Sequence, residues 1–275
     1  MTTRREIVKA GAGLAAVIAA GKAPAAFIRS ALAARNAMMA GGAKPYWGLT
    51  FVAEQANSTV RLTSVGTPPA VSLATSTDGG KTWTPYAIGA TMALSAVGDS
   101  VCFAAAEGAT NQNFGSGGGR YYHQFVMSGR IAASGDIRSL LSCDETAAPS
   151  VEMKGYTYAS MFQDCTALVS APDLPATTLV STCYRQMFYG CSSLIAAPHL
   201  PATTLKTNCY ANMFRDCSSL ASVSVAFESF SGTSNWLSGV AATGTFRCPH
   251  ALGTSETITR GASACPDGWN VVNID

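Results

Sequence analysis

Few residues of this chain have the types and spacing that catalysis requires. Its three histidines, His123, His199 and His250, are scattered along the sequence without catalytic partners, and neither H-E-x-x-H nor G-x-S-x-G occurs. A catalytic site needs an acid, a base or a nucleophile that converge on one substrate. We therefore predict a protein that is not an enzyme, with no catalytic residue and no cofactor.

The cysteines offer chemistry of a different kind. The chain has nine, but no C-x-x-C pair, so zinc-ribbon and thioredoxin-type sites have no support and no metal site is predicted. Cys165, Cys191 and Cys217 share one position of an internal repeat, where we expect small buried apolar groups, with disulfides within or between repeats as the alternative. Outside the repeats, Cys248 and Cys265 are the better disulfide candidates in an exported chain, and both states stay open.

One short segment, residues 76–83, combines a carboxylate, glycines and a tryptophan. It fits the pattern S-x-D-x-G-x-x-W, which predicts a β-hairpin whose Asp78 and Gly80 shape the turn while Trp83 packs beneath it. Gly80-Lys81-Thr82 also invites a phosphate-loop interpretation, but position 75 is threonine where that loop needs glycine. A single copy indicates a hairpin and not glycan cleavage.

Composition excludes two broad classes of protein. Hydrophobic residues make up 48% of the chain and charged residues only 12%, so the chain is not disordered. The net charge is +2, and four of the 18 basic residues fall within the first 22 positions. Nucleic-acid binding needs a basic stripe, and the rest of the chain has none.

Residues 1–42 have the features of an export signal. Basic residues from Arg4 to Lys9 precede a short apolar run, and an A-x-A site follows at Ala23-Pro24-Ala25, as in a bacterial export signal of the twin-arginine type. The run is too short to span a bilayer, so no transmembrane segment is predicted. The alternative is an ordinary N-terminal helix through Ala26–Met39 that ends at Gly41 and Gly42.

The second predicted segment, residues 43–150, is a small antiparallel, β-sandwich-like domain that also caps the first repeat. Alternating polar and apolar residues predict strands at 59–63 and 71–73, and further strands are predicted at 92–94, 101–103, 125–127, Ile131 and 137–141. The glycine-rich stretch 111–119 is predicted to be a surface loop.

Residues 158–220 repeat with an offset of 26 residues, which predicts a solenoid. In one unit, Tyr184, Met187, Phe188 and Cys191 fall at i, i+3, i+4 and i+7, the face of a short helix. An extended segment from Leu194 must end by Pro198-His199-Leu200-Pro201, because two prolines cannot lie inside a helix or a central strand. Positions that stay the same between units are predicted to be scaffold: Met161, Phe162, Cys165, Leu168, Met187, Phe188, Cys191, Leu194, Met213, Phe214, Cys217 and Leu220.

The repeat unit C-Y-x-x-M-F-x-x-C-[ST]-x-L-x-x-x-P-x-L-P-A-T-T-L resembles that of BspA-like leucine-rich repeat proteins of gut and oral bacteria and their phages. The resemblance implies a surface or secreted protein that binds host matrix, partner cells or glycans. The array is short, two units and a half, and Thr157 stands where a cysteine would complete the first unit. The expected fold is α+β: the β-domain, a helix-plus-strand solenoid at 151–224, and a C-terminal cap at 225–275.

Positions that differ between units are the candidate partner contacts. They are Gln163, Tyr189 and Arg215 at one repeat position, Asp173 and His199 at a second, and Arg185 and Lys206 at two others. Asp164 and Asp216, with Gly190 between them, are expected to be solvated or to cap a helix end.

Taken together, these features predict an exported, non-enzymatic recognition or adhesion protein that binds a host protein, a partner cell or a glycan. The alternatives are a phage or prophage virion component, such as a receptor-binding fibre tip, and a glycan-active enzyme that uses the middle domain.

Overall fold

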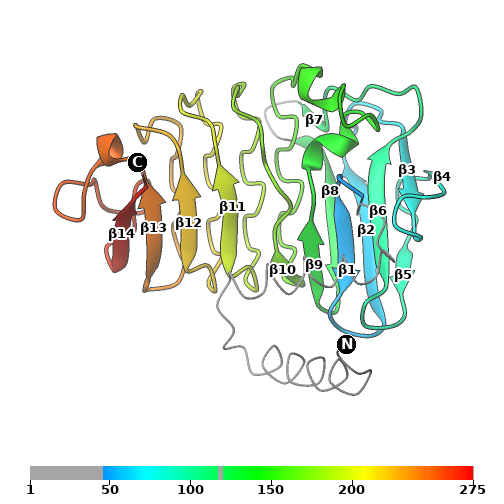
Figure 1. The fold of residues 1–275 in the computed structure, drawn as a ribbon, viewed down its shortest axis with the longest axis horizontal. Coiled ribbons are helices and arrows are strands. Elements are labelled where there is room, and N and C mark those ends of the chain that lie inside the picture. Colours follow the sequence, from blue (N-terminus) through cyan, green and yellow to red (C-terminus); the bar gives the residue numbers. More distant parts are fainter. Residues whose placement is uncertain (1–45, 117–119, 275) are drawn as a thin grey trace, which may run out of the picture. The chain divides into compact units, whose positions relative to one another are not determined.

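The computed structural model of this chain describes residues 46–116 and 120–274, so the predicted leader at 1–42 lies outside the described residues. Within these ranges the fold consists of strands, turns and short 3-10 helices, without an α-helix (Figure 1). The prediction of an α+β fold with helix-plus-strand repeats is therefore wrong. The repeats stack instead as a β-solenoid.

Two sheets form the first part of the molecule, and one of them includes β10, the strand of the first coil of the solenoid. One has six strands in the order β10-β9-β1-β6-β3-β4, and the other has four in the order β5-β2-β8-β7. All their strand pairs are antiparallel except β9 with β10. The strands are β1 (Thr50–Ala53), β2 (Ser58–Val65), β3 (Leu73–Ser76), β4 (Thr84–Tyr86), β5 (Met92–Leu94), β6 (Ser100–Ala105), β7 (Gly115–Ser116), β8 (Tyr121–Ser128), β9 (Ile131–Ser134) and β10 (Leu168–Ser170).

Aromatic side chains join these two sheets. The ring centroids of Phe51 in β1 and Phe103 in β6 lie 4.8 and 5.2 Å from that of Phe125 in β8. Along β2, Val60 and Leu62 are buried while Arg61 between them is exposed, as alternation predicts. The core of this part is thus a layer of rings between two half-buried sheets.

Most strands predicted from alternation are present. The segments 59–63, 92–94, 101–103 and 125–127 lie in β2, β5, β6 and β8, whereas 71–73 overlaps β3 only at Leu73. The strand predicted at 137–141 is wrong, because Ile137–Leu140 form a 3-10 helix. The carboxylate of Asp136 accepts a hydrogen bond from the Arg138 N–H and begins that helix.

The hairpin predicted at residues 76–83 is confirmed between β3 and β4. Asp78 Oδ1 accepts hydrogen bonds from the N–H groups of Lys81 and Thr82, each 3.0 Å long, and from Ser76 Oγ at 2.7 Å. The Trp83 ring packs edge-on against Tyr46 with centroids 5.0 Å apart. Because every bond to Asp78 is donated to its charged form, chiefly from Thr82, the pKa of Asp78 lies well below its ordinary value of 3.8.

A pH-dependent contribution to stability follows from this turn. The folded pKa of Asp78 is depressed, so its contribution is present above the unfolded value and is lost as pH falls through the folded one. We expect Asp78→Asn to have a lower melting temperature than the parent at neutral pH. The difference should shrink as pH falls below about 3.8. A difference in melting temperature that is the same at pH 7 and in acid would contradict this assignment.

The segments predicted as helices are runs of four-residue turns. We call their surface the turn face, defined by residues 156–164, 182–190 and 208–216. A left-handed backbone conformation recurs at every fourth residue, which a right-handed α-helix does not allow. The residues with positive φ are Tyr156, Ser160 and Asp164, then Thr182, Gln186 and Gly190, then Asn208, Asn212 and Asp216.

Hydrogen bonding explains why the turns replace a helix. Alternate N–H groups donate three residues back within their own coil, as Met161 does to the Tyr158 carbonyl at 3.3 Å. The N–H groups between them donate to the next coil, as Phe162 does to the Met187 carbonyl at 2.8 Å. A turn and a helix both place residues i, i+3, i+4 and i+7 on one side, so the apolar pattern cannot distinguish them.

The opposite surface of the solenoid, the strand face, is a parallel sheet of β11 (Ala196–Leu200), β12 (Ser222–Val225), β13 (Gly244–Cys248) and β14 (Trp269–Asn273). Each strand comes from a successive coil (Figure 1). Pro198 lies within β11, although the sequence argument excluded proline from a central strand. Strand β11 is an edge of this sheet, and its register with β12 shifts between Ala196 and His199. An edge with an irregular register is where a strand tolerates proline.

The solenoid continues beyond the repeat that the sequence shows. The N–H of Phe214 donates to the carbonyl of Trp236, 22 residues ahead, whereas that of Phe188 donates to Met213, 25 residues ahead. The next coil is therefore three residues shorter at this point. The side chains of this coil also differ from those of the three repeats, so the 26-residue pattern does not identify it as a further coil.

Two columns of stacked rings run through the coils. Phe125, Phe162, Phe188 and Phe214 form one, with successive centroids 5.2, 5.3 and 5.4 Å apart and rings within 12° of parallel. Phe114, Tyr158, Tyr184, Tyr210 and Trp236 form the other. Phe125 of β8 is the first ring of one column, Phe114, just before β7, is the first ring of the other, and Trp236 is the last ring of that second column.

The cysteines at the shared repeat position are free and buried, as predicted. Each thiol donates a hydrogen bond to a phenylalanine carbonyl of the preceding layer: Cys165 to Phe125, Cys191 to Phe162, and Cys217 to Phe188, at 2.9–3.0 Å. Cys248 and Cys265 are also buried, and no disulfide joins them.

Candidate partner-binding surface

The twelve predicted scaffold side chains line the interior of the coils. None is more than 2% exposed. Burial raises the pKa of Cys217 to about 12, and it raises the pKa values of Cys165 and Cys191 in the same direction. These thiols stay protonated at neutral pH and cannot act as thiolate nucleophiles.

Three candidate contact residues stand side by side on the turn face. Gln163, Tyr189 and Arg215 occupy the same position of successive coils. The Arg215 guanidinium lies 5.8 Å from the centre of the Tyr189 ring, a cation–π arrangement. Arg215 also forms an ion pair with Asp216, with Nε and Oδ2 3.6 Å apart. The column thus offers an amide, a phenol and a guanidinium in a row.

Strand β8 lies beside the first coil at the end of this column, which the sequence did not predict. The Gln124 side-chain amide donates to the Gln163 carbonyl. Tyr122 lies near Asp164, and burial, together with that carboxylate, raises the pKa of Tyr122. No repeat pattern includes β8, so only its stacking on the first coil could identify these neighbours.

Beside this column runs a second one in which aspartate and glycine alternate: Asp164, Gly190, Asp216 and Gly239. All four have positive φ. A Cβ atom on Gly190 would collide with Asp164 Oδ1, and one on Gly239 with Asp216 Oδ1. Each aspartate therefore folds over the glycine of the next coil. Both aspartates are exposed to solvent, as one of the two expectations held, but they do not cap a helix end, because these segments are not helical.

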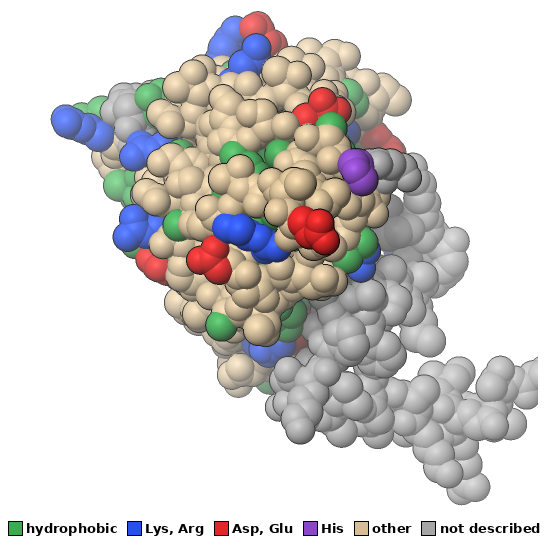
Figure 2. Space-filling view, turned by 90° about the vertical axis from the view of Figure 1, so that its left-hand side faces the viewer, with side chains coloured by type: hydrophobic (Ala, Val, Ile, Leu, Met, Phe, Trp, Pro, Cys, Tyr) green, Lys and Arg blue, Asp and Glu red, His purple; other side chains and the backbone are tan. Residues whose placement is uncertain are grey.

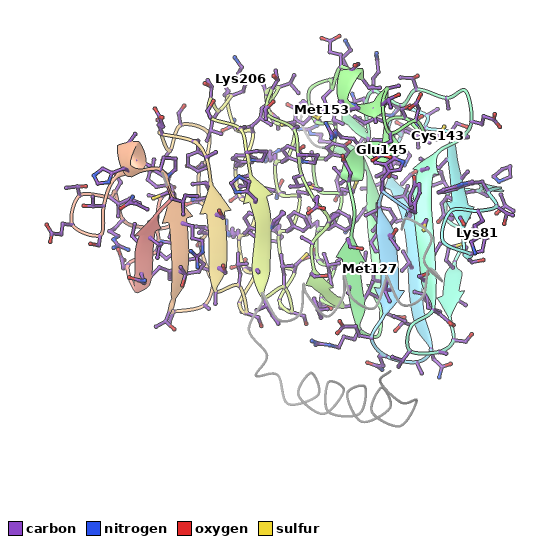
Figure 3. The ribbon with its side chains drawn as sticks, viewed as in Figure 1. Lys81, Met127, Cys143, Glu145, Met153 and Lys206 are labelled. Atoms are coloured by element: carbon purple, nitrogen blue, oxygen red, sulfur yellow. The ribbon has the colours of Figure 1, made fainter. Side chains whose placement is uncertain are left out.

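The remaining candidates do not belong to this column. His199 lies exposed on β11, on the strand face, and its Nδ1 is 3.0 Å from Ser224 Oγ of β12. Asp173 is exposed after β10. Lys206 projects from the loop that follows β11 (Figure 3), and Arg185 is half-buried within the second turn segment. The seven predicted contacts therefore divide between faces.

His123 is buried, with both ring nitrogens partnered. Its Nε2–H donates to the Pro69 carbonyl at 2.8 Å, so its Nδ1 accepts from Ser64 Oγ at 3.1 Å. Desolvation lowers the pKa of His123, which keeps the ring neutral at pH 7. These contacts show that His123 is a structural residue of the two sheets β10-β9-β1-β6-β3-β4 and β5-β2-β8-β7.

Charged side chains are sparse on the face of the molecule that Figure 2 shows. Figure 2 looks at the end of the molecule that lies on the left of Figure 1, and shows mainly uncharged polar and backbone atoms with scattered groups of both signs. In the described part of the chain, no three His, Cys, Asp or Glu side chains gather as a metal site would need. Nor do residues 46–116 and 120–274 include a helix long and apolar enough to cross a membrane.

Comparison of the chain with protein-family models, with curated proteins and with solved structures finds no match. Functional inference therefore depends on the geometry of the chain itself.

Proposed function

We propose that this chain is an exported, non-enzymatic recognition protein whose turn face binds a protein or glycan on a host or neighbouring cell. The observation that carries the proposal is the column of Gln163, Tyr189 and Arg215. The coils hold their interior residues constant and change this outward position. The three side chains at this position, an amide, a phenol and a guanidinium, can each donate hydrogen bonds to a partner.

The chemistry of the column fits recognition. Tyrosine and arginine are the side chains most enriched among residues that dominate binding energy, because they combine large apolar area with directional hydrogen bonds. The Arg215 guanidinium lies over the Tyr189 ring, which limits the motion of both side chains before a partner arrives. The buried ring columns beneath supply a rigid support. The resemblance of the repeat to those of bacterial surface proteins points the same way.

Binding to a glycan array and to a panel of extracellular matrix proteins tests this proposal. For any ligand found, Tyr189→Ala combined with Arg215→Ala should weaken binding by about tenfold or more. His199→Ala, which alters an exposed side chain of the strand face, is the matched control and should bind as the parent does. Loss of binding in the control but not in the turn-face variant would contradict the proposal.

Export is tested separately. If the protein reaches the cell surface through its leader, mass spectrometry of the native protein should show that residues 1–25 have been removed. An intact N-terminus on protein recovered from purified virions would instead favour the virion component.

A further inference from the structure

The three sheets have six edge strands among the described residues, and one of them differs from the rest. Open edges invite pairing with other chains, and proteins usually blunt them. Strands β4 and β5 have three residues each, β7 has two, and β10 has three with a shifted register. Strand β11 contains Pro198 and also shifts register. In contrast, β14 runs for five residues in unbroken register and contains neither proline nor a charged residue.

The hydrogen bonds of β14 identify its free backbone groups. The Ile274 N–H donates to the Cys248 carbonyl of β13, so Asn270 and Val272, which share its orientation, also face β13. The backbone groups of Trp269, Val271 and Asn273 must face away. For Trp269 the carbonyl is already satisfied by Arg260 Nη1 at 2.9 Å. Within the described chain, nothing pairs with the outward backbone groups of Val271 and Asn273.

We propose that β14 pairs antiparallel with β14 of a second copy of this chain, around a twofold axis at Val272. In that register Val271 lies opposite Asn273 of the second copy and exchanges two hydrogen bonds with it, and the symmetric pair adds two more. The four otherwise open backbone groups of each chain are thereby satisfied.

The side chains of Asn270, Val272 and Ile274, which share one face of the sheet, suit this partner. In the proposed register Val272 faces Val272 of the second copy, as a directly opposed β-branched pair, which stabilises antiparallel strands. Asn270 faces Ile274 of the second copy, and Ile274 is 40% exposed in the single chain. None of these side chains is charged, so symmetric pairing brings no like charges into opposition.

A single proline substitution in β14 tests the proposal. The parent should show concentration-dependent dimerisation in sedimentation or light-scattering measurements of the full chain. Val271→Pro removes an outward N–H without touching the ladder to β13, and should lower the association constant by at least about tenfold. Val271→Ala keeps that N–H and is the matched control, which should still dimerise.

A second pair of variants covers the case in which Val271→Pro fails to fold. Val272→Lys and Val272→Glu should each weaken self-association, because like charges would face each other at the axis. An equimolar mixture of the two should restore it as a heterodimer. A parent that stays monomeric at every concentration, or a folded Val271→Pro variant that dimerises like the parent, would overturn the proposal, as would a mixture that fails to associate.

Discussion

Replacing Phe188 by aspartate is expected to abolish the cooperative unfolding transition of the solenoid. Phe188 is fully buried, and its ring stacks between those of Phe162 and Phe214 at 5.3 and 5.4 Å. Removing a buried phenylalanine side chain alone costs about 3–5 kcal/mol, and an unpaired carboxylate in its place adds several more. The sum approaches the whole stability of a typical domain, about 5–15 kcal/mol.

Two controls separate the causes in this experiment, which is read by denaturant unfolding followed by circular dichroism. Phe188→Leu keeps an apolar side chain but loses both ring contacts, and should cost about 1–3 kcal/mol. Ser218→Asp places the same new charge at an exposed position of the third coil and should change stability little. If Phe188→Asp unfolded with the midpoint and slope of the parent, the ring column would not be the core of the solenoid.

The second large effect is expected at Gly190. Alanine there must adopt the left-handed conformation, φ +72°, which costs about 1–2 kcal/mol. Its Cβ must also displace the Asp164 carboxylate that covers Gly190. We expect Gly190→Ala to lower the free energy of unfolding by roughly 2–4 kcal/mol. Equilibrium denaturation measures this difference directly.

A matched glycine and a double variant isolate the collision with Asp164. Gly108 has nearly the same φ, +73°, but a Cβ there would have no neighbour within 4 Å, so Gly108→Ala reports the backbone cost alone. Adding Asp164→Gly to Gly190→Ala should restore part of the lost stability, beyond the sum of the two single changes. Equal costs at Gly190 and Gly108 would show that Asp164 does not constrain the next coil.

Much of the buried interior could be predicted from sequence. The 26-residue offset identified the stacked units, and the residues constant between them, such as Phe188 and Cys191, are buried. The hairpin around Asp78 was predictable because its turn depends on local side-chain hydrogen bonds. Local pattern also located most strands of the two-sheet part, where one buried face makes residues alternate.

The candidate site was only partly predictable. Comparison of the units separated Gln163, Tyr189 and Arg215 from the scaffold, but it could not assign His199 to the opposite face. Neither could it foresee that β8 would add Gln124 to the column, since β8 shares no repeat with the coils.

By itself, the sequence determined that the chain repeats, which side chains are inside, and where the hairpin turns. Only the tertiary structure decided the backbone conformation of each unit. Half of the N–H groups in a turn segment donate to the next coil, so that conformation is stable only when a neighbour is stacked on it. A helix would satisfy those groups within one unit, and the apolar pattern fits both. The choice therefore depends on contacts between coils that no local pattern encodes.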